Sequence, residues 1–313
     1  RLLSRGLGDV YKRQAMNCVT SSSVMRIISR RLLMFVKLTL KFWLRLNQAE
    51  VIVHKMRVFK VSSVNVFGME ASSFFDLSEQ ISDEIMSSLS SLEDWGIADG
   101  HPGQYKHDVI ADEIMTPQLI AAGLGVISEE SEPTGLDKPF VAIVDPIDGS
   151  TNANLGLPWY ALSLCLVHNE EAVAAFVKNL AMGETFRAEL GSGAEKNSQK
   201  IVVSGVTDIE DSIVVFNDLP TKHFGWRQYR ALGSAALDLC KVADGSFDAF
   251  VDMGEGLAIW DYAGAALICK EAGAKITDIE SNPISHQLGI QRRQVICAGS
   301  DELHNTILSL MSQ

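Results

Sequence analysis

Cysteine is scarce in this sequence, and no two cysteines stand close together. The 313 residues include five cysteines and no C-x-x-C pair. An odd, scattered set of this kind does not indicate a disulfide framework. Because most of these cysteines lie in apolar runs, we expect reduced thiols in the core of a cytoplasmic protein. The five are Cys18, Cys165, Cys240, Cys269 and Cys297.

Long apolar runs are also missing. No uninterrupted apolar segment approaches the ~18 residues that a membrane-spanning helix needs, so we expect no membrane span. Hydrophobic residues nevertheless make up 47% of the chain. This amount is enough for the core of one large globular domain or of two ordinary ones.

Acidic residues are almost absent from residues 1–68, where 13 Lys or Arg accompany only Asp9 and Glu50. This segment carries a charge of +11, and because the whole chain carries −12, residues 69–313 carry −23. An acidic body argues against nucleic acid as a partner. If the body binds an anion, divalent cations held by its carboxylates would supply the attraction.

The basic segment 1–68 has three competing interpretations: an organellar transit peptide, a basic helix on a membrane surface, or upstream sequence translated ahead of the true start. Its opening, RLLSRGLGDVYKRQ, has no initiator methionine and resembles translated adapter sequence. We favour the third interpretation, with Met69 as the start. Residues 1–68 are then expected to have no part in the fold.

Two carboxylates follow a short apolar strand near the middle of the chain. The run from Phe140 to Val144 is rich in β-branched side chains, which predicts a buried strand that ends at Asp145. Asp148 follows three residues later. Because Pro146 lacks an amide hydrogen and restricts the residue before it, we expect both aspartates on an irregular turn at the mouth of the strand.

Small residues come directly after these aspartates. Gly149, Ser150 and Thr151 are suited to open a helix. The first N–H groups of a helix, together with its dipole, favour a bound anion. The stretch therefore predicts a joint site for a metal ion and a phosphate group.

The segment from Asp145 to Asn152, DPIDGSTN, resembles the first motif of the inositol monophosphatase superfamily, D-P-[IL]-D-G-[ST]-[TS]-N. The resemblance continues through the rest of the body of the chain. It implies a layered αβαβα fold of the α/β class, with an N-terminal α+β half at 69–205 and a C-terminal α/β half at 206–313. It also implies a Mg-dependent, lithium-sensitive sugar phosphatase that forms a homodimer.

The hydrophobic spacing predicts secondary structure throughout that body. Apolar residues at helical spacing indicate a helix over 72–93. A second helix is expected at about 108–122, where Pro117 favours a kink or a new start. The further expected elements are strands at 125–128, 160–168, 172–178, 185–190, 212–217, 248–253, 274–278 and 294–299, and helices at 233–245, 262–272 and 301–312.

A glutamate pair follows the strand expected at 125–128. The sequence VISEES resembles the family motif G-E-E-S, with Ser128 in place of the usual glycine. The resemblance implies that Glu129 bridges metal ions and orients the attacking water. By itself, such a pair is typical of a solvated loop; its position sixteen residues before Asp145 favours the site.

A tryptophan and an aspartate form the last motif. Trp260 and Asp261 begin a segment that resembles the family's W-D-x-A-[GA]…E-A-G-G signature. The resemblance implies that Asp261 is a metal ligand. An aspartate there would also cap the helix expected at 262–272, and the two roles are compatible.

The implied cofactor is Mg²⁺, with two or three ions in the site. The implied ligands are all oxygens, which suit Mg²⁺, and the lack of His and Cys among them argues against zinc. The implied reaction is attack of an activated water on a phosphate monoester, with Glu129 and Ser150 aiming the water. The ligands are Glu129, Asp145, Asp148, Asp261 and the Ile147 carbonyl, and the phosphate would rest on Gly149, Ser150 and Thr151.

Two assignments stay open. Relatives hold the hydroxyl at the Ser150 position with an upstream aspartate, and either Asp108 or Asp112 in KHDVIAD meets that description. The spacing before Asp261 is two residues longer than usual, so either Asp252 or Glu255 is a candidate hydroxyl partner for the substrate. The other implied substrate contacts are Asp148, Gly233, Ser234 and Ala235.

The substrate class is a small phosphate ester, with inositol 1-phosphate as the first choice. Relatives with the same metal residues act on fructose 1,6-bisphosphate, histidinol phosphate or 3′-phosphoadenosine 5′-phosphate. A covalent phosphatase of the haloacid dehalogenase type is disfavoured, since it needs D-x-D and the chain has D-x-x-D. A non-enzymatic alternative is a catalytically silent relative that binds metal or a partner protein.

Overall fold

The computed structural model describes residues 69–99, 103–284 and 292–311. All of these described residues belong to one compact unit. The expectations for residues 1–68 lie outside the described residues. None of the helices in the described ranges is long and apolar enough to cross a membrane.

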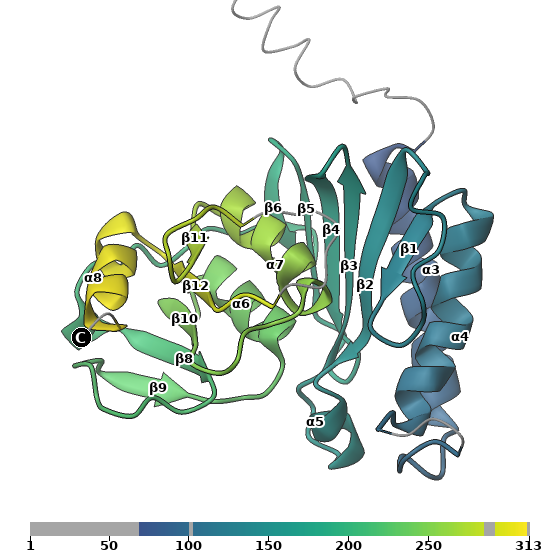
Figure 1. The fold of residues 1–313 in the computed structure, drawn as a ribbon, viewed down its shortest axis with the longest axis horizontal. Helices are drawn as coiled ribbons and strands as arrows, with labels where there is room; N and C mark the ends of the chain where they lie inside the picture. Colours follow the sequence, from purple (N-terminus) through teal and green to yellow (C-terminus); the bar gives the residue numbers. More distant parts are fainter. Residues whose placement is uncertain (1–68, 100–102, 285–291, 312–313) are drawn as a thin grey trace, which may run out of the picture. The chain divides into compact units, whose positions relative to one another are not determined.

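The first sheet has seven strands in the order β1-β2-β3-β4-β5-β6-β7 (Figure 1). β1 and β2 are parallel, so their carboxyl ends meet at the same edge, whereas the later neighbours are antiparallel. The expected run of antiparallel strands is confirmed. The strands are β1 (Gly125–Ser128), β2 (Phe140–Asp148), β3 (Ala161–His168), β4 (Glu171–Asn179), β5 (Thr185–Glu189), β6 (Gly193–Lys196) and β7 (Gln199–Lys200).

β2 is longer than its sequence predicts. We expected the strand to end at Asp145, but Asp145 pairs with Ser163, and Asp148 still pairs with Ala161. The register shifts between these pairs, as in a β-bulge. Pro146 lies in this irregular part, where its missing N–H breaks no ladder hydrogen bond. The prediction of a turn was therefore wrong, although the predicted irregularity is present within the strand.

Two helices cover the outer face of this sheet (Figure 1). α3 (Ala71–Ser90) presents an apolar face with Phe74, Ile81 and Ile85 in the core. α4 (Lys106–Ala121) runs on through Pro117 as one helix. We infer that packing of the buried side chains on either side of the proline compensates for the backbone hydrogen bond that it cannot make.

The second sheet has five strands in the order β11-β12-β10-β8-β9. β10 pairs in parallel with β8 and antiparallel with β12, so the sheet is mixed. Its strands are β8 (Ile213–Asn217), β9 (Gln228–Arg230), β10 (Ala249–Asp252), β11 (Lys275–Asp278) and β12 (Val295–Ala298), with a 3-10 helix η1 (Ile209–Asp211) before β8.

Helices α6 (Ala235–Ala243) and α7 (Ile259–Glu271) lie between the two sheets, and α8 (Asp301–Met311) covers the far side of the second sheet (Figure 1). α7 approaches β3 closely, because a Cβ on Gly264 would lie only 3.0 Å from the Leu164 carbonyl. These layers confirm the expected αβαβα architecture. In the chain, the expected boundary at 205/206 comes after the last strand of the first sheet and before the first strand of the second sheet. The division into an N-terminal and a C-terminal half stays a prediction.

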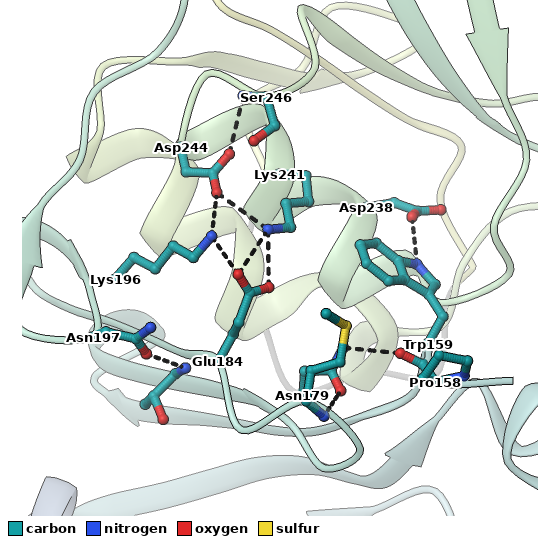
Figure 2. Close-up of polar contacts among 12 residues, drawn as sticks. Pro158, Trp159, Asn179, Glu184, Lys196, Asn197, Asp238, Lys241, Asp244 and Ser246 are labelled. Carbon is teal, nitrogen blue, oxygen red and sulfur yellow. Dashed lines mark hydrogen bonds and ion pairs between the residues drawn. The ribbon is translucent and has the colours of Figure 1, made fainter.

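An ionic network holds the C-terminal end of α6 against the first sheet (Figure 2). Lys196 Nζ lies 2.5 Å from Glu184 and 3.1 Å from Asp244, while Lys241 Nζ lies 2.9 Å from Glu184. Partly buried pairs that share partners in this way restrain geometry better than isolated surface pairs. The network therefore helps to set the position of α6, whose other end enters the site described next.

Candidate active site

Three carboxylates from separate elements converge at one edge of the first sheet. Ligand oxygens of Glu129, Asp145 and Asp261 all lie within 4.8 Å of one another. Glu129 follows β1, Asp145 belongs to β2, and Asp261 lies in the first turn of α7. The three are thus brought together by the parallel pairing of β1 with β2 and by the packing of α7 on the sheet.

The electrostatics of this cluster favour a bound cation. Asp145 is only 2% exposed, and burial, followed by the charges of Glu129 and Asp148, raises its pKa well above the usual value. Burial, followed by the charges of Asp148 and Glu129, raises the pKa of Asp261 to about 8. Three crowded carboxylates cannot all ionise cheaply without a compensating positive charge. The all-oxygen donor set therefore fits a hard divalent ion.

Asp261 does not occupy the capping position that we expected. α7 begins at Ile259 rather than at residue 262, so Asp261 is its third residue. From there Asp261 Oδ2 accepts a hydrogen bond of 2.7 Å from the Ala258 N–H at the preceding turn. The carboxylate still satisfies a free amide of the helix start, and its other oxygen remains available to the cluster.

Asp148 faces the start of α6 instead. Its Oδ2 accepts hydrogen bonds from Ser234 Oγ at 2.5 Å and from the Ala236 N–H at 2.7 Å, and its Oδ1 accepts one from the Ala235 N–H at 3.3 Å. Burial raises its pKa to about 6, against the lowering effect of these bonds. Asp148, an expected metal ligand, thus lies in contact with Ser234 and Ala235, two expected substrate contacts.

Of the two aspartates that could hold the Ser150 hydroxyl, Asp108 is the one that contacts it. Ser150 Oγ is 2.8 Å from Asp108 Oδ1 and 2.8 Å from the Ile147 carbonyl, so its proton has two acceptors. Asp112 instead accepts a 2.6 Å hydrogen bond from Ser128 Oγ. Burial raises the pKa of Asp108 to about 6, against the hydrogen bond from Ser150.

Gly149 forms the tight corner between β2 and the short helix α5 (Ser150–Asn154). Its φ of +97° suits glycine, and a Cβ there would lie 2.9 Å from the Trp159 carbonyl and 3.1 Å from the Gly233 carbonyl. No other residue type fits this corner without strain. The start of α5 therefore follows Asp148 directly in the chain, and Thr151 in its first turn is exposed.

Comparison of the chain with known proteins shows which family it belongs to. Residues 106–313 match the inositol monophosphatase family. The chain belongs to that family. A fructose-1,6-bisphosphatase/inositol-1-monophosphatase of Archaeoglobus fulgidus is 33% identical over 248 residues, which cover 75% of this chain and 96% of that protein. An inositol-1-monophosphatase of Mesorhizobium japonicum is 33% identical over 201 residues, covering 57% of this chain and 74% of the relative.

Solved structures of family type agree with the fold. An extragenic suppressor protein of Bartonella henselae superposes with a TM-score of 0.66 at 28% identity, covering 77% of this chain and 100% of that chain. An inositol monophosphatase of Thermotoga maritima gives 0.65 at 25% identity, covering 76% and 95%. Both alignments span nearly the whole length of the solved chains.

The two candidate hydroxyl partners of this family member differ in their surroundings. Asp252 is 0% exposed, and its Oδ1 accepts hydrogen bonds from Asn217 Nδ2 at 3.2 Å and the Gly254 N–H at 3.0 Å. Its buried Oδ2 has no hydrogen-bond partner among the described residues. Glu255 is exposed. An unpaired buried acceptor is costly unless a ligand satisfies it, which favours Asp252 as the contact.

Sequence reasoning missed the role of Asn152, the last residue of the DPIDGSTN motif. Its Nδ2 lies 2.8 Å from the Trp159 carbonyl, 2.7 Å from the Leu232 carbonyl and 3.3 Å from the Gly233 carbonyl. Trp159 in turn donates its indole N–H to Asp238 of α6 at 2.9 Å (Figure 2). Asn152 therefore ties the expected phosphate loop to the expected substrate loop. Its place in the motif was the available signal.

A pocket of about 520 Å³ borders the cluster on the side of Glu129. It is lined by the loop after β1 and by Trp260 at the start of α7. Burial and nearby acids raise the pKa of Glu130, which also lines it, to about 8. Glu129, the exposed member of the carboxylate cluster, is thus accessible from this side.

Proposed function

We propose that this chain is a Mg²⁺-dependent phosphatase that hydrolyses inositol 1-phosphate or a similar sugar phosphate. The observation that carries the proposal is the convergence of Glu129, Asp145 and Asp261 within 4.8 Å. The Archaeoglobus relative is named as a fructose-1,6-bisphosphatase/inositol-1-monophosphatase, and the Mesorhizobium relative as an inositol-1-monophosphatase. Both lines of support point to phosphate ester hydrolysis at a metal centre.

The proposed metal ligands are the three clustered carboxylates, with Asp148 and the Ile147 carbonyl completing the set. Bound Mg²⁺ would supply Lewis acidity toward both the attacking water and the ester oxygen. Asp148 is already held by the start of α6. Its oxygens are not part of the group of three carboxylates that lie within 4.8 Å of one another.

The chain's own residues position the reactants. Ser150, whose hydroxyl lies against Asp108, and Glu129 would accept hydrogen bonds from an attacking water. The N–H groups of Gly149, Ser150 and Thr151 would bind the phosphate oxygens. Asp252 would accept a hydrogen bond from a substrate hydroxyl through its unpaired oxygen.

Several alternatives within the family remain as proposals. The substrate could be fructose 1,6-bisphosphate, histidinol phosphate or 3′-phosphoadenosine 5′-phosphate. The homodimer, the sensitivity to Li⁺ and the cytoplasmic location are likewise predictions. A catalytically silent relative is the alternative of another class, and the retention of all three clustered carboxylates disfavours it.

The test is phosphate release by the full chain from inositol 1-phosphate, fructose 1,6-bisphosphate, histidinol phosphate and 3′-phosphoadenosine 5′-phosphate. We expect turnover of at least one sugar phosphate that requires Mg²⁺ and stops on chelation, because the carboxylate cluster has no other means to activate water. Activity that survives chelation would contradict the metal mechanism. Silence on every ester would favour the non-catalytic alternative.

Asp108→Asn is expected to lower kcat about 100-fold with little change in KM, because Ser150 would lose its ionised acceptor and water would be poorly oriented. Asp112→Asn is the matched control: that carboxylate receives Ser128 and Thr116 instead. We expect the control to lose stability by about 1–2 kcal/mol while keeping kcat within about threefold. Equal losses of kcat in the two variants would refute a special role for Asp108.

A further inference from the structure

His107 lies in the first turn of α4, directly before Asp108. Its side chain is 0% exposed. The imidazole packs against two aromatic rings: its centroid is 5.1 Å from that of Tyr105, in a nearly parallel stack, and 5.1 Å from that of Trp95. The ring is therefore shielded from water and held by aromatic contacts beside a residue of the candidate active site.

These surroundings suit an apolar side chain better than a histidine. Neither ring nitrogen of His107 has a hydrogen-bond partner among the described residues. A buried nitrogen without a partner costs stability, and a phenylalanine ring would pack against the same aromatic neighbours without that cost. The presence of a histidine here therefore indicates a partner that the imidazole meets during the reaction.

A carboxylate lies close to this ring. His107 Nε2 is 3.4 Å from Asp108 Oδ1, the oxygen that also accepts the 2.8 Å hydrogen bond from Ser150 Oγ. The other oxygen, Oδ2, accepts a hydrogen bond of 3.2 Å from the Tyr105 N–H. A carboxylate oxygen has two lone pairs, so Oδ1 can accept from Ser150 and His107 together. The 3.4 Å contact is longer than an ordinary hydrogen bond, as contacts in active sites often are before the substrate binds.

The imidazole is expected to be neutral and to donate to Asp108. Burial lowers the pKa of His107, and backbone groups of Ser150 and Trp95 only partly oppose that effect. The first turn of a helix also disfavours a positive charge. A neutral imidazole carries one N–H, and an acceptor beside Nε2 favours the tautomer with the proton on that nitrogen. His107 can thus give Asp108 a hydrogen bond without a net charge.

We propose that His107 is a positioning residue: in the loaded site its Nε2–H donates to Asp108 Oδ1 and holds the carboxylate where it accepts the Ser150 proton. The inference rests on the proposed function and deepens it. The Ser150 hydroxyl has a second acceptor 2.8 Å away in the Ile147 carbonyl, which is a proposed metal ligand. A fixed Asp108 keeps the Ser150 proton off that carbonyl, so that the Ser150 lone pairs stay available to the attacking water.

The test measures phosphate release with Mg²⁺, on the ester that wild type hydrolyses fastest, in three variants of His107. His107→Phe keeps a ring against Tyr105 and Trp95 but has no N–H, and it should lower kcat about 10-fold while KM changes less than about threefold. His107→Gln and His107→Met are a matched pair of similar length, of which only glutamine can donate. Glutamine should restore kcat to within about threefold of wild type, whereas methionine should match phenylalanine.

Thermal unfolding and a double variant separate this role from a structural one. Phenylalanine removes two unpaired nitrogens, so His107→Phe should melt at or above the temperature of wild type. In an Asp108→Asn background, His107→Phe should lower kcat by less than about threefold more, because its effect passes through that carboxylate.

Three results would overturn the assignment and leave the phosphatase activity established. They are full kcat in the phenylalanine variant, equal kcat in the glutamine and methionine variants, and an undiminished loss in the Asp108→Asn background. A wild type that releases phosphate from no sugar phosphate would refute the proposed function itself, and the role of His107 with it.

Discussion

Asp145→Asn is expected to lower kcat/KM by about 10³-fold or more, which corresponds to about 4 kcal/mol of transition-state stabilisation. Asp145 is the most buried member of the carboxylate cluster. An amide in its place donates as well as accepts and carries no charge, so it cannot hold a divalent cation against Glu129 and Asp261 in the same way. Loss of the ion would remove the activation of water and of the leaving group together.

The same substitution should not weaken the metal-free fold. Asp145 Oδ1 accepts a hydrogen bond from the Ile147 N–H, and an asparagine oxygen can accept that bond as well. Removing one of several crowded acids relieves their repulsion, so the metal-free variant should be more stable than wild type by about 1–2 kcal/mol at pH 8. Lower activity with equal or higher stability would separate a catalytic role from a structural one.

The measurement pairs phosphate release with thermal unfolding, each with and without Mg²⁺. Asp137→Asn is the matched control, an exposed aspartate three residues before β2. It should keep activity within about twofold and stability within about 0.5 kcal/mol. A variant at Asp145 that retains Mg-dependent turnover, or that unfolds well below wild type without metal, would contradict the proposed role.

Without metal, the free energy of unfolding is expected to fall by about 2–4 kcal/mol between pH 5.5 and pH 8.5. In the folded state the pKa of Asp148 is raised to about 6 and that of Asp261 to about 8, from an ordinary value of 3.8. The folded protein therefore holds protons that the unfolded chain releases. This contribution to stability is complete below about pH 4 and is lost as the pH rises through the folded-state pKa values.

Mg²⁺ should reverse this dependence, because it competes with the protons for the same carboxylates. At a free concentration 100-fold above its dissociation constant, the ion would add about 2.7 kcal/mol. The increase in melting temperature on adding Mg²⁺ should thus be larger at pH 8.5 than at pH 5.5. A metal-free profile that is flat over this range, or an increase of the same size at both pH values, would contradict the described electrostatics.

The region around β2 shows which structural features could be predicted from the sequence and which could not. The apolar run from Phe140 predicted the strand, and the small residues after Asp148 predicted the helix that begins at Ser150. The end of the strand was wrong, because strand pairing continues through Pro146 with a shift of register. A local pattern cannot show that, since the neighbouring strand β3 supplies the pairing partners.

A local sequence pattern also could not distinguish Asp108 from Asp112 as the partner of Ser150. The two residues are four apart, so they share one face of α4, and both are buried. The contact between Asp108 and Ser150 depends on how α4 packs against the end of β2.

The sequence by itself determined the order of the elements, the family and the acids that we expect to carry the chemistry, because periodic apolar patterns and short motifs are local properties of the chain. The tertiary structure alone decided which of those acids meet. Glu129 and Asp145 come together through parallel strand pairing, whereas Asp148 turns to the start of α6. Burial and charge then act among groups far apart in the chain, and those long-range terms exist only after the layers have packed.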